Sequence, residues 1–150
     1  MGKKYPCMMI GAVCSLLLSG GCVWLFPPPE PGPEAVLAGT WLVEQERDTV
    51  ITELYWVFDS FGHATEVRYK WPSFLGDVTV TDPVESQETT VNGDEVTVRL
   101  IWGLGWDSTF EGTLNAEQTE IEGRLTLNYQ AGADGTKIEI DQGNATLIRQ

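Results

Sequence analysis

The chain has 150 residues, of which 22 are acidic and 9 are basic, and its formal net charge is −13. A field of this sign repels the phosphates of nucleic acids and the heads of anionic lipids, so we expect no nucleic-acid partner. The length leaves room for one domain with one hydrophobic core.

The N-terminal residues have the organisation of an export signal. Lys3 and Lys4 form a short basic segment, and residues 8–18 are an apolar stretch that is too short to span a bilayer alone. The alternative is an uncleaved helix, because apolar residues continue through Trp24 and Phe26. Both interpretations place the rest of the chain outside the cytoplasm and next to a membrane.

The cysteines are concentrated at this end of the chain. Cys7 and Cys14 fall inside the expected signal, and Cys22 is the single cysteine that follows it. No intrachain disulfide can therefore form after the signal, although exported domains often contain one. This position indicates another use for the Cys22 thiol.

Residues 16–22, Leu-Leu-Leu-Ser-Gly-Gly-Cys, resemble the end of a bacterial lipoprotein signal. That family ends its signal with Leu, a small residue, Gly or Ala, and then Cys, and here the Leu is displaced by one position to Leu18. The resemblance implies a signal peptide over residues 1–21, a diacylglyceryl group on Cys22 and an acyl chain such as palmitate on the new amine. Two or more chains give a stable membrane anchor. By the same resemblance, Val23 implies the outer membrane of the cell envelope.

Residues 22–36 are interpreted as a tether. Five prolines between residues 27 and 33 exclude the interior of a helix or a sheet, so we expect a polyproline-like arm. At about 3.1 Å per residue, the ten or so residues from position 27 would hold the next domain roughly 30 Å from the membrane. A recognition motif for a partner domain is the alternative.

Residues 37–150 show period-two alternation of apolar and polar residues, which predicts strands and no convincing helix. The expected strands are residues 39–44, 52–58, 64–71, 77–91, 96–102, 109–114, 121–127 and 137–149. Asn92-Gly93 is a strong hairpin signal. Pro83 interrupts the fourth strand and gives nine strands if it makes a hairpin, and a bulge is expected near Gly143.

Sequential antiparallel strands with short turns predict an all-β domain, either an up-and-down barrel of about eight strands or a β-sandwich. The two ends of this domain resemble the lipocalin-like (calycin) superfamily. Its barrels begin with Gly-x-Trp, here Gly39 and Trp41, and a late Arg, here Arg149, packs across that indole. A Trp41–Arg149 contact requires an even number of strands, which favours eight, with Pro83 as a kink.

Eight strands place the loops at 46–50, 71–76, 103–105 and 130–136 at the end of the barrel that lies away from the chain termini. Two of these loops carry aromatic residues and glycines, so we predict an apolar mouth that faces away from the tether. The candidate ligand-contact residues are Trp56, Tyr69, Trp71, Phe74, Trp102 and Trp106, and Phe110 and Tyr129 belong to the same aromatic set. Plain core packing is the alternative for these side chains.

We find no constellation of residues that indicates catalysis. The one histidine, His63, lies at a turn, and the absence of a cysteine beyond Cys22 excludes Cys–His catalysis and cysteine-based zinc sites. Asp82, Glu85 and Glu88 are interpreted as a solvated charged face rather than a calcium site. We therefore expect no enzyme activity, no cofactor and no metal ion.

Two functions fit these observations. In the first, a membrane-anchored barrel holds a small hydrophobic ligand at its mouth. In the second, the barrel has a filled interior and contacts a partner protein in the cell envelope. An enzyme whose site leaves no signal in the sequence is a third.

Overall fold

A computed structural model of the chain describes residues 28–46, 51, 53–131 and 135–150. The chain divides into two compact units, Met1–Glu30 and Pro31–Gln150. Cys22 and the expected signal at 1–21 lie outside the described residues. In the part of the chain that is described, no helix is long and apolar enough to cross a bilayer.

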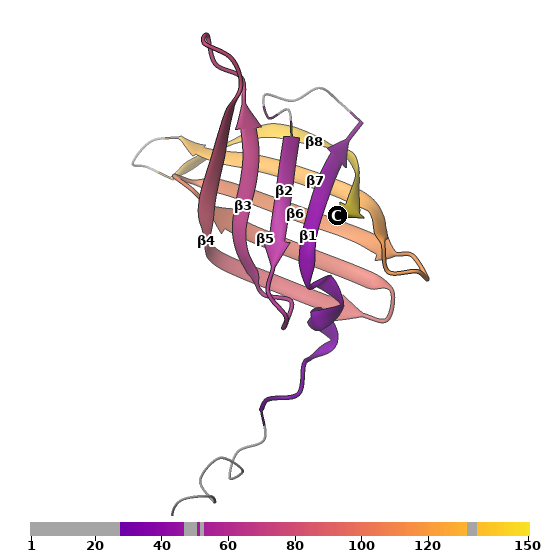
Figure 1. Cartoon of the computed structure of the whole chain (residues 1–150). Helices are drawn as coiled ribbons and strands as arrows, with labels where there is room; N and C mark the ends of the chain where they lie inside the picture. The colour runs from indigo at the N-terminus through magenta and orange to yellow at the C-terminus, as the bar shows by residue number, and fades with distance from the viewer. Residues whose placement is uncertain (1–27, 47–50, 52, 132–134) are drawn as a thin grey trace, which may run out of the picture. The chain divides into compact units, whose positions relative to one another are not determined.

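Eight antiparallel strands close into a barrel in the order of the sequence, because β1 pairs with both β2 and β8 (Figure 1). The predicted eight-stranded, up-and-down barrel is confirmed, and the alternative of a sandwich is wrong. The strands are β1 (Gly39–Gln45), β2 (Glu53–Phe58), β3 (Ala64–Trp71), β4 (Val78–Asn92), β5 (Glu95–Trp102), β6 (Trp106–Leu114), β7 (Glu120–Ala131) and β8 (Thr136–Arg149).

Pro83 lies within one continuous strand, as the even strand number required. Strand β4 pairs with β3 as far as Pro83 and with β5 from Val84 onward, and its register with β5 shifts between Val84 and Ser86. A proline has no N–H to give to a ladder, so it fits where a strand passes from one neighbour to the next.

The last strand is bulged as expected, but at Ile140 rather than at Gly143 itself. Gly143 pairs regularly with Leu125, and the register of β7 with β8 shifts instead between Leu127 and Asn128, where Ile140 has no partner. Glycine in a strand marks either a bulge or a place with another packing requirement, and sequence alone does not separate the two.

The start of β6 also differs from the prediction, which placed it at residue 109. Gly103 and Gly105 adopt positive φ angles of 55° and 106°, a region that glycine enters without steric cost. The chain therefore reverses within three residues, and Trp102 pairs directly with Trp106. Trp106 is a strand residue rather than a loop residue.

A 3₁₀ helix, η1 (Pro33–Leu37), precedes the barrel at the end opposite the β3–β4 hairpin (Figure 1). The expectation of an extended arm up to residue 36 is wrong for residues 33–36, which belong to this helix. A proline suits the first turn of a helix, where its missing N–H would have no partner. The carbonyl of Leu37, itself buried, accepts a hydrogen bond of 2.7 Å from Trp41 Nε1, which fixes η1 to β1.

The expected contact between the two ends of the barrel is confirmed. Trp41 pairs with Arg149 across β1 and β8, and the guanidinium carbon lies 4.5 Å from the centre of the indole. Arg149 also donates hydrogen bonds to the carbonyls of Ala38 at 2.7 Å, Gln118 at 2.9 Å and Val36. One guanidinium thus joins η1, the β6–β7 turn and the closing pair of strands.

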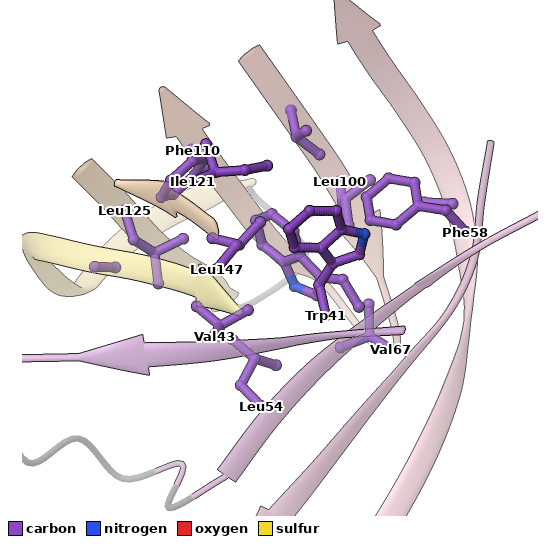
Figure 2. Close-up of a cluster of buried hydrophobic side chains, with 14 of the residues drawn as sticks. Trp41, Val43, Leu54, Phe58, Val67, Leu100, Phe110, Ile121, Leu125 and Leu147 are labelled. Carbon is purple, nitrogen blue, oxygen red and sulfur yellow. The ribbon is translucent and has the colours of Figure 1, made fainter. Parts of the chain in front are cut away.

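The core fills the centre of the barrel. Trp41, Trp56, Trp102 and Phe110 have no exposed surface, and smaller aliphatic side chains from all eight strands surround them. Figure 2 shows Trp41 among side chains that include Phe58 of β2, Leu100 of β5 and Leu147 of β8. The interior at this level is therefore packed with protein.

Candidate functional site

Five aromatic side chains form a chain of ring contacts in the half of the barrel away from η1. We call Tyr69, Trp71, Trp102, Trp106 and Tyr129 the aromatic cluster. The rings of Trp102 and Trp106 are stacked, with centroids 5.3 Å apart and planes 11° apart. Tyr69 lies 5.1 Å from Trp102, while Tyr129 and Trp71 lie 5.0 Å and 6.2 Å from Trp106. Four strands, β3, β5, β6 and β7, therefore contribute to one aromatic surface.

Strand alternation and the short β5–β6 turn explain why these rings meet. Tyr69 and Trp71 share the inner face of β3, and the turn makes Trp102 and Trp106 direct neighbours across the ladder. Exposure rises toward the rim: Trp102 is completely buried, Trp106 is 8% exposed and Trp71 is 38% exposed. The cluster thus extends from the core to solvent.

Large apolar side chains are exposed around this end of the barrel. Phe74 and Leu75 at the tip of the β3–β4 hairpin and Leu104 in the β5–β6 turn are each more than 90% exposed. The hairpin projects from the barrel at the top of Figure 1. We call the following residues the apolar rim: Phe74, Leu75, Val78, Leu104, Ile138 and Ile140.

The structure brings together only part of the predicted ligand-contact set. Tyr69, Trp71, Trp102 and Trp106 are in contact, whereas Phe74 extends into solvent. Trp56 lies in the core, where its ring packs edge-to-face on Phe110 at 6.3 Å. Trp56 thus lies apart from the other candidates, because its position on β2 directs it toward the barrel centre. A role in ligand binding stays a prediction for all six residues.

A carboxylate that sequence reasoning misplaced lies beside the aromatic cluster. Asp82 is half-buried on the inner face of β4, and the Tyr69 hydroxyl donates a 2.9 Å hydrogen bond to its Oδ2. Burial, together with this bond and the charge of Asp82, raises the pKa of Tyr69 to about 12. The interpretation of Asp82 as part of a solvated face is wrong. Asp82 lies two residues from both Val80 and Val84, and this spacing indicated that its side chain shares their inner face of the strand.

Some buried polar atoms lack a hydrogen-bond partner among the described residues, and one inward glycine has open space beside it. The buried atoms Trp56 Nε1 and Gln45 Oε1 have no hydrogen-bond partner among the described residues. Gly143 faces inward opposite Leu125, and a Cβ added there would meet no described atom within 4 Å. By contrast, a Cβ on Gly123 would lie 2.6 Å from the Cα of Gly112. Open space therefore lies beside Gly143, whereas Ala145 and Leu147 on the same face of β8 are buried in the core.

An ion-pair network on the outer wall supports the strand that carries Trp106. The next residue, Asp107, is buried, and its carboxylate accepts hydrogen bonds of 3.1 Å and 3.0 Å from Arg99 and a further bond from Lys137. The hydrogen bonds from Arg99 hold the pKa of Asp107 below its usual range. Since neighbouring strand residues face opposite sides, Asp107 outside keeps Trp106 inside.

The residues that the structure describes include no group of three His, Cys, Asp or Glu side chains placed to hold a metal ion.

No family model matches the sequence, and no curated protein matches it either. Solved structures do resemble the fold. Pallilysin of Treponema pallidum is 18% identical, with a TM-score of 0.45 over 78% of this chain and 80% of that one.

Two biotin complexes also resemble the barrel. The bradavidin2–biotin complex is 11% identical, with a TM-score of 0.41 over 75% of this chain and 97% of that one. The rhizavidin–biotin complex is 18% identical, with a TM-score of 0.38 over 75% of this chain and 100% of that one. Likenesses of this size carry no conclusion about ligands, so the functional argument below uses this chain's own residues.

Proposed function

We propose that this chain is a lipid-anchored protein of the bacterial cell envelope whose barrel binds a small hydrophobic ligand at its mouth. The observation that carries the ligand assignment is the aromatic cluster together with the apolar rim, both at one end of the barrel. Soluble proteins rarely expose several large apolar side chains next to one another, and where they do, the patch commonly marks a binding site.

Burial energetics support a ligand at this place. The side chains of Phe74, Leu75 and Leu104 are almost wholly exposed, and covering one such side chain contributes about 1.5–3 kcal/mol. Packing of the domain does not require them, because each lies in a turn outside the core. A ligand that covers the rim and stacks on Trp71 gains this contribution.

The filled centre of the barrel favours a second candidate function. The centre has no room for a ligand, because it is filled by the fully buried side chains of Trp41, Trp56 and Phe110. A ligand must therefore bind at the mouth or beside Gly143. A barrel of this kind also suits a protein partner that covers the apolar rim. The two functions differ in whether an isolated small molecule binds.

Fluorescence of an uncharged apolar probe, N-phenyl-1-naphthylamine, tests the ligand site. Residues 31–150 form one compact unit with its own core and provide the protein for the measurement. We expect saturable binding that weakens by tenfold or more in the double variant Phe74→Ser/Leu104→Ser, which removes two exposed contacts without disturbing the core. A tenfold loss corresponds to about 1.4 kcal/mol, less than one buried apolar side chain contributes.

Phe61→Ser is the matched control, since Phe61 is 40% exposed but lies in the β2–β3 turn at the other end of the barrel. This variant should bind the probe as the unaltered domain does. An absence of binding to a broad panel of uncharged apolar molecules refutes the ligand function and leaves the protein partner.

The proposed membrane anchor is supported by the sequence alone. The basic residues at 3–4, the apolar stretch at 8–18 and the small residues before Cys22 are those of a lipoprotein signal, and Val23 favours the outer membrane. We expect mass spectrometry of the protein purified from its native membrane to find residue 22 at the N-terminus with a diacylglyceryl group. Cys22→Ser should move the protein from the membrane to the soluble fraction, whereas Cys14→Ser should not. A mature protein with a free Cys22 thiol contradicts the anchor.

A further inference from the structure

We propose that the ligand at the mouth is an organic cation, an apolar molecule that carries an ammonium group. Asp82 supplies the opposite charge, and the aromatic cluster supplies the ring faces that contact the ammonium's alkyl groups. This inference rests on the proposed function and names its ligand class.

Among the residues that the structure describes, no cation pairs with the carboxylate of Asp82. It is half-buried on the inner face of β4 between Val80 and Val84, and its described partner is the neutral hydroxyl of Tyr69. None of the salt bridges among the described residues includes Asp82. The contrast is Asp107, which is also withdrawn from water but lies between Arg99 and Lys137. A partly desolvated charge with no counter-charge favours a cation from outside.

The β5–β6 turn brings this carboxylate next to an indole. A Cβ added to Gly103 would lie 2.6 Å from Asp82 Oδ2 and 3.4 Å from Trp106 Cδ1. Any larger residue at position 103 would therefore separate the two groups, and its φ of 55° also favours glycine. Carboxylate and ring meet at one point of the mouth as a result.

Asp82 also lies on the part of β4 that extends past the pairing of β4 with β5. Strand β4 begins its pairing with β5 at Val84, so residues 78–83 extend beyond the β5–β6 turn without a partner on that side. Val78 begins this segment and pairs with Trp71 of β3, and both side chains are exposed, Trp71 at 38% and Val78 at 49%. A ligand can reach Asp82 along this edge.

The aromatic rings and the negative charge of the protein both favour an organic cation. A quaternary or alkylated ammonium is attracted to the face of an indole, most strongly where water is excluded. The net charge of −13 raises the local concentration of cations at the surface and repels anionic amphiphiles. An uncharged apolar molecule uses the rings but gains nothing from Asp82.

Two probes of the same shape isolate the contribution of charge. Benzyltrimethylammonium and neopentylbenzene differ only in a quaternary nitrogen in place of a carbon. We expect residues 31–150 to bind the cation about tenfold more tightly than its uncharged isostere, as measured by quenching of tryptophan fluorescence. Asp82→Asn, which still accepts the Tyr69 hydrogen bond, should remove this preference and leave the affinity for the isostere unchanged.

Asp94→Asn is the matched control, because it changes the net charge equally but lies in the exposed β4–β5 turn at the other end of the barrel. It should keep the cation preference. If Asp82→Asn does not fold, Asp82→Thr serves as the second variant: it also removes the charge and has a side chain suited to a strand, so the cation preference should again disappear. Equal affinity for both probes overturns this inference but not the proposed function, and binding of neither probe contradicts both.

Discussion

Replacing Trp41 with alanine is expected to lower the free energy of unfolding by about 3–5 kcal/mol. The indole has no exposed surface, and its removal leaves a large cavity among the side chains of Figure 2. The substitution also deprives the Leu37 carbonyl of its 2.7 Å hydrogen bond and removes the ring beneath the Arg149 guanidinium. The barrel therefore loses packing and the contacts that close its ends.

Chemical denaturation of residues 31–150 measures this effect. Trp71→Ala is the control, because Trp71 is the same residue type on the same sheet but is 38% exposed at the rim. We expect the Trp71 variant to lose less than about 1 kcal/mol, as exposed positions do. A loss that small in Trp41→Ala would be incompatible with its place at the closure of the barrel.

The two inward glycines at positions 123 and 143 are expected to respond to alanine in opposite directions. On β7, a Cβ at Gly123 would lie 2.6 Å from the Cα of Gly112 and still closer to the Glu111 carbonyl oxygen, so strands β6 and β7 must separate. We expect Gly123→Ala to destabilise the barrel by about 1–3 kcal/mol.

On β8, a Cβ at Gly143 meets free space among the described residues. Alanine removes conformational freedom from the unfolded chain at no steric cost, and we expect Gly143→Ala to stabilise the barrel by about 0.5–1 kcal/mol. Both changes are read from the midpoints of urea denaturation curves. Destabilisation of similar size in the two variants would show that the space beside Gly143 is already filled.

Much of the barrel was predictable because its signals are local. Period-two alternation identified every strand, as in β3, where Val67 and Tyr69 face inward and Lys70 faces outward. The requirement that Trp41 and Arg149 meet then fixed an even strand number and made Pro83 a position within one strand. Alternation by itself left a β-sandwich open, and the Trp41–Arg149 contact that the calycin resemblance implied favoured the closed barrel of eight strands.

The sequence-based predictions were wrong at positions where the conformation depends on backbone geometry and on the neighbouring strands. Trp106 looked like a loop residue, because the tightness of the Gly103–Gly105 turn depends on φ angles that sequence does not state. The bulge at Ile140, not Gly143, reflects the register of β8 against β7. Residues 33–36 form a helix because the end of the barrel offers Leu37 a buried place.

In the candidate site, too, some features follow from local sequence patterns and others only from the tertiary structure. The sequence alone determined that aromatic residues gather at one end of an eight-stranded barrel, because alternation and connectivity assign each side chain a face and an end. Only the tertiary structure decided which rings touch, that Trp56 belongs to the core, and that Asp82 lies near Trp106 with no counter-charge among the described residues. These facts depend on stagger and curvature of the sheet, which place residues far apart in the chain within contact distance and are set by all eight strands together.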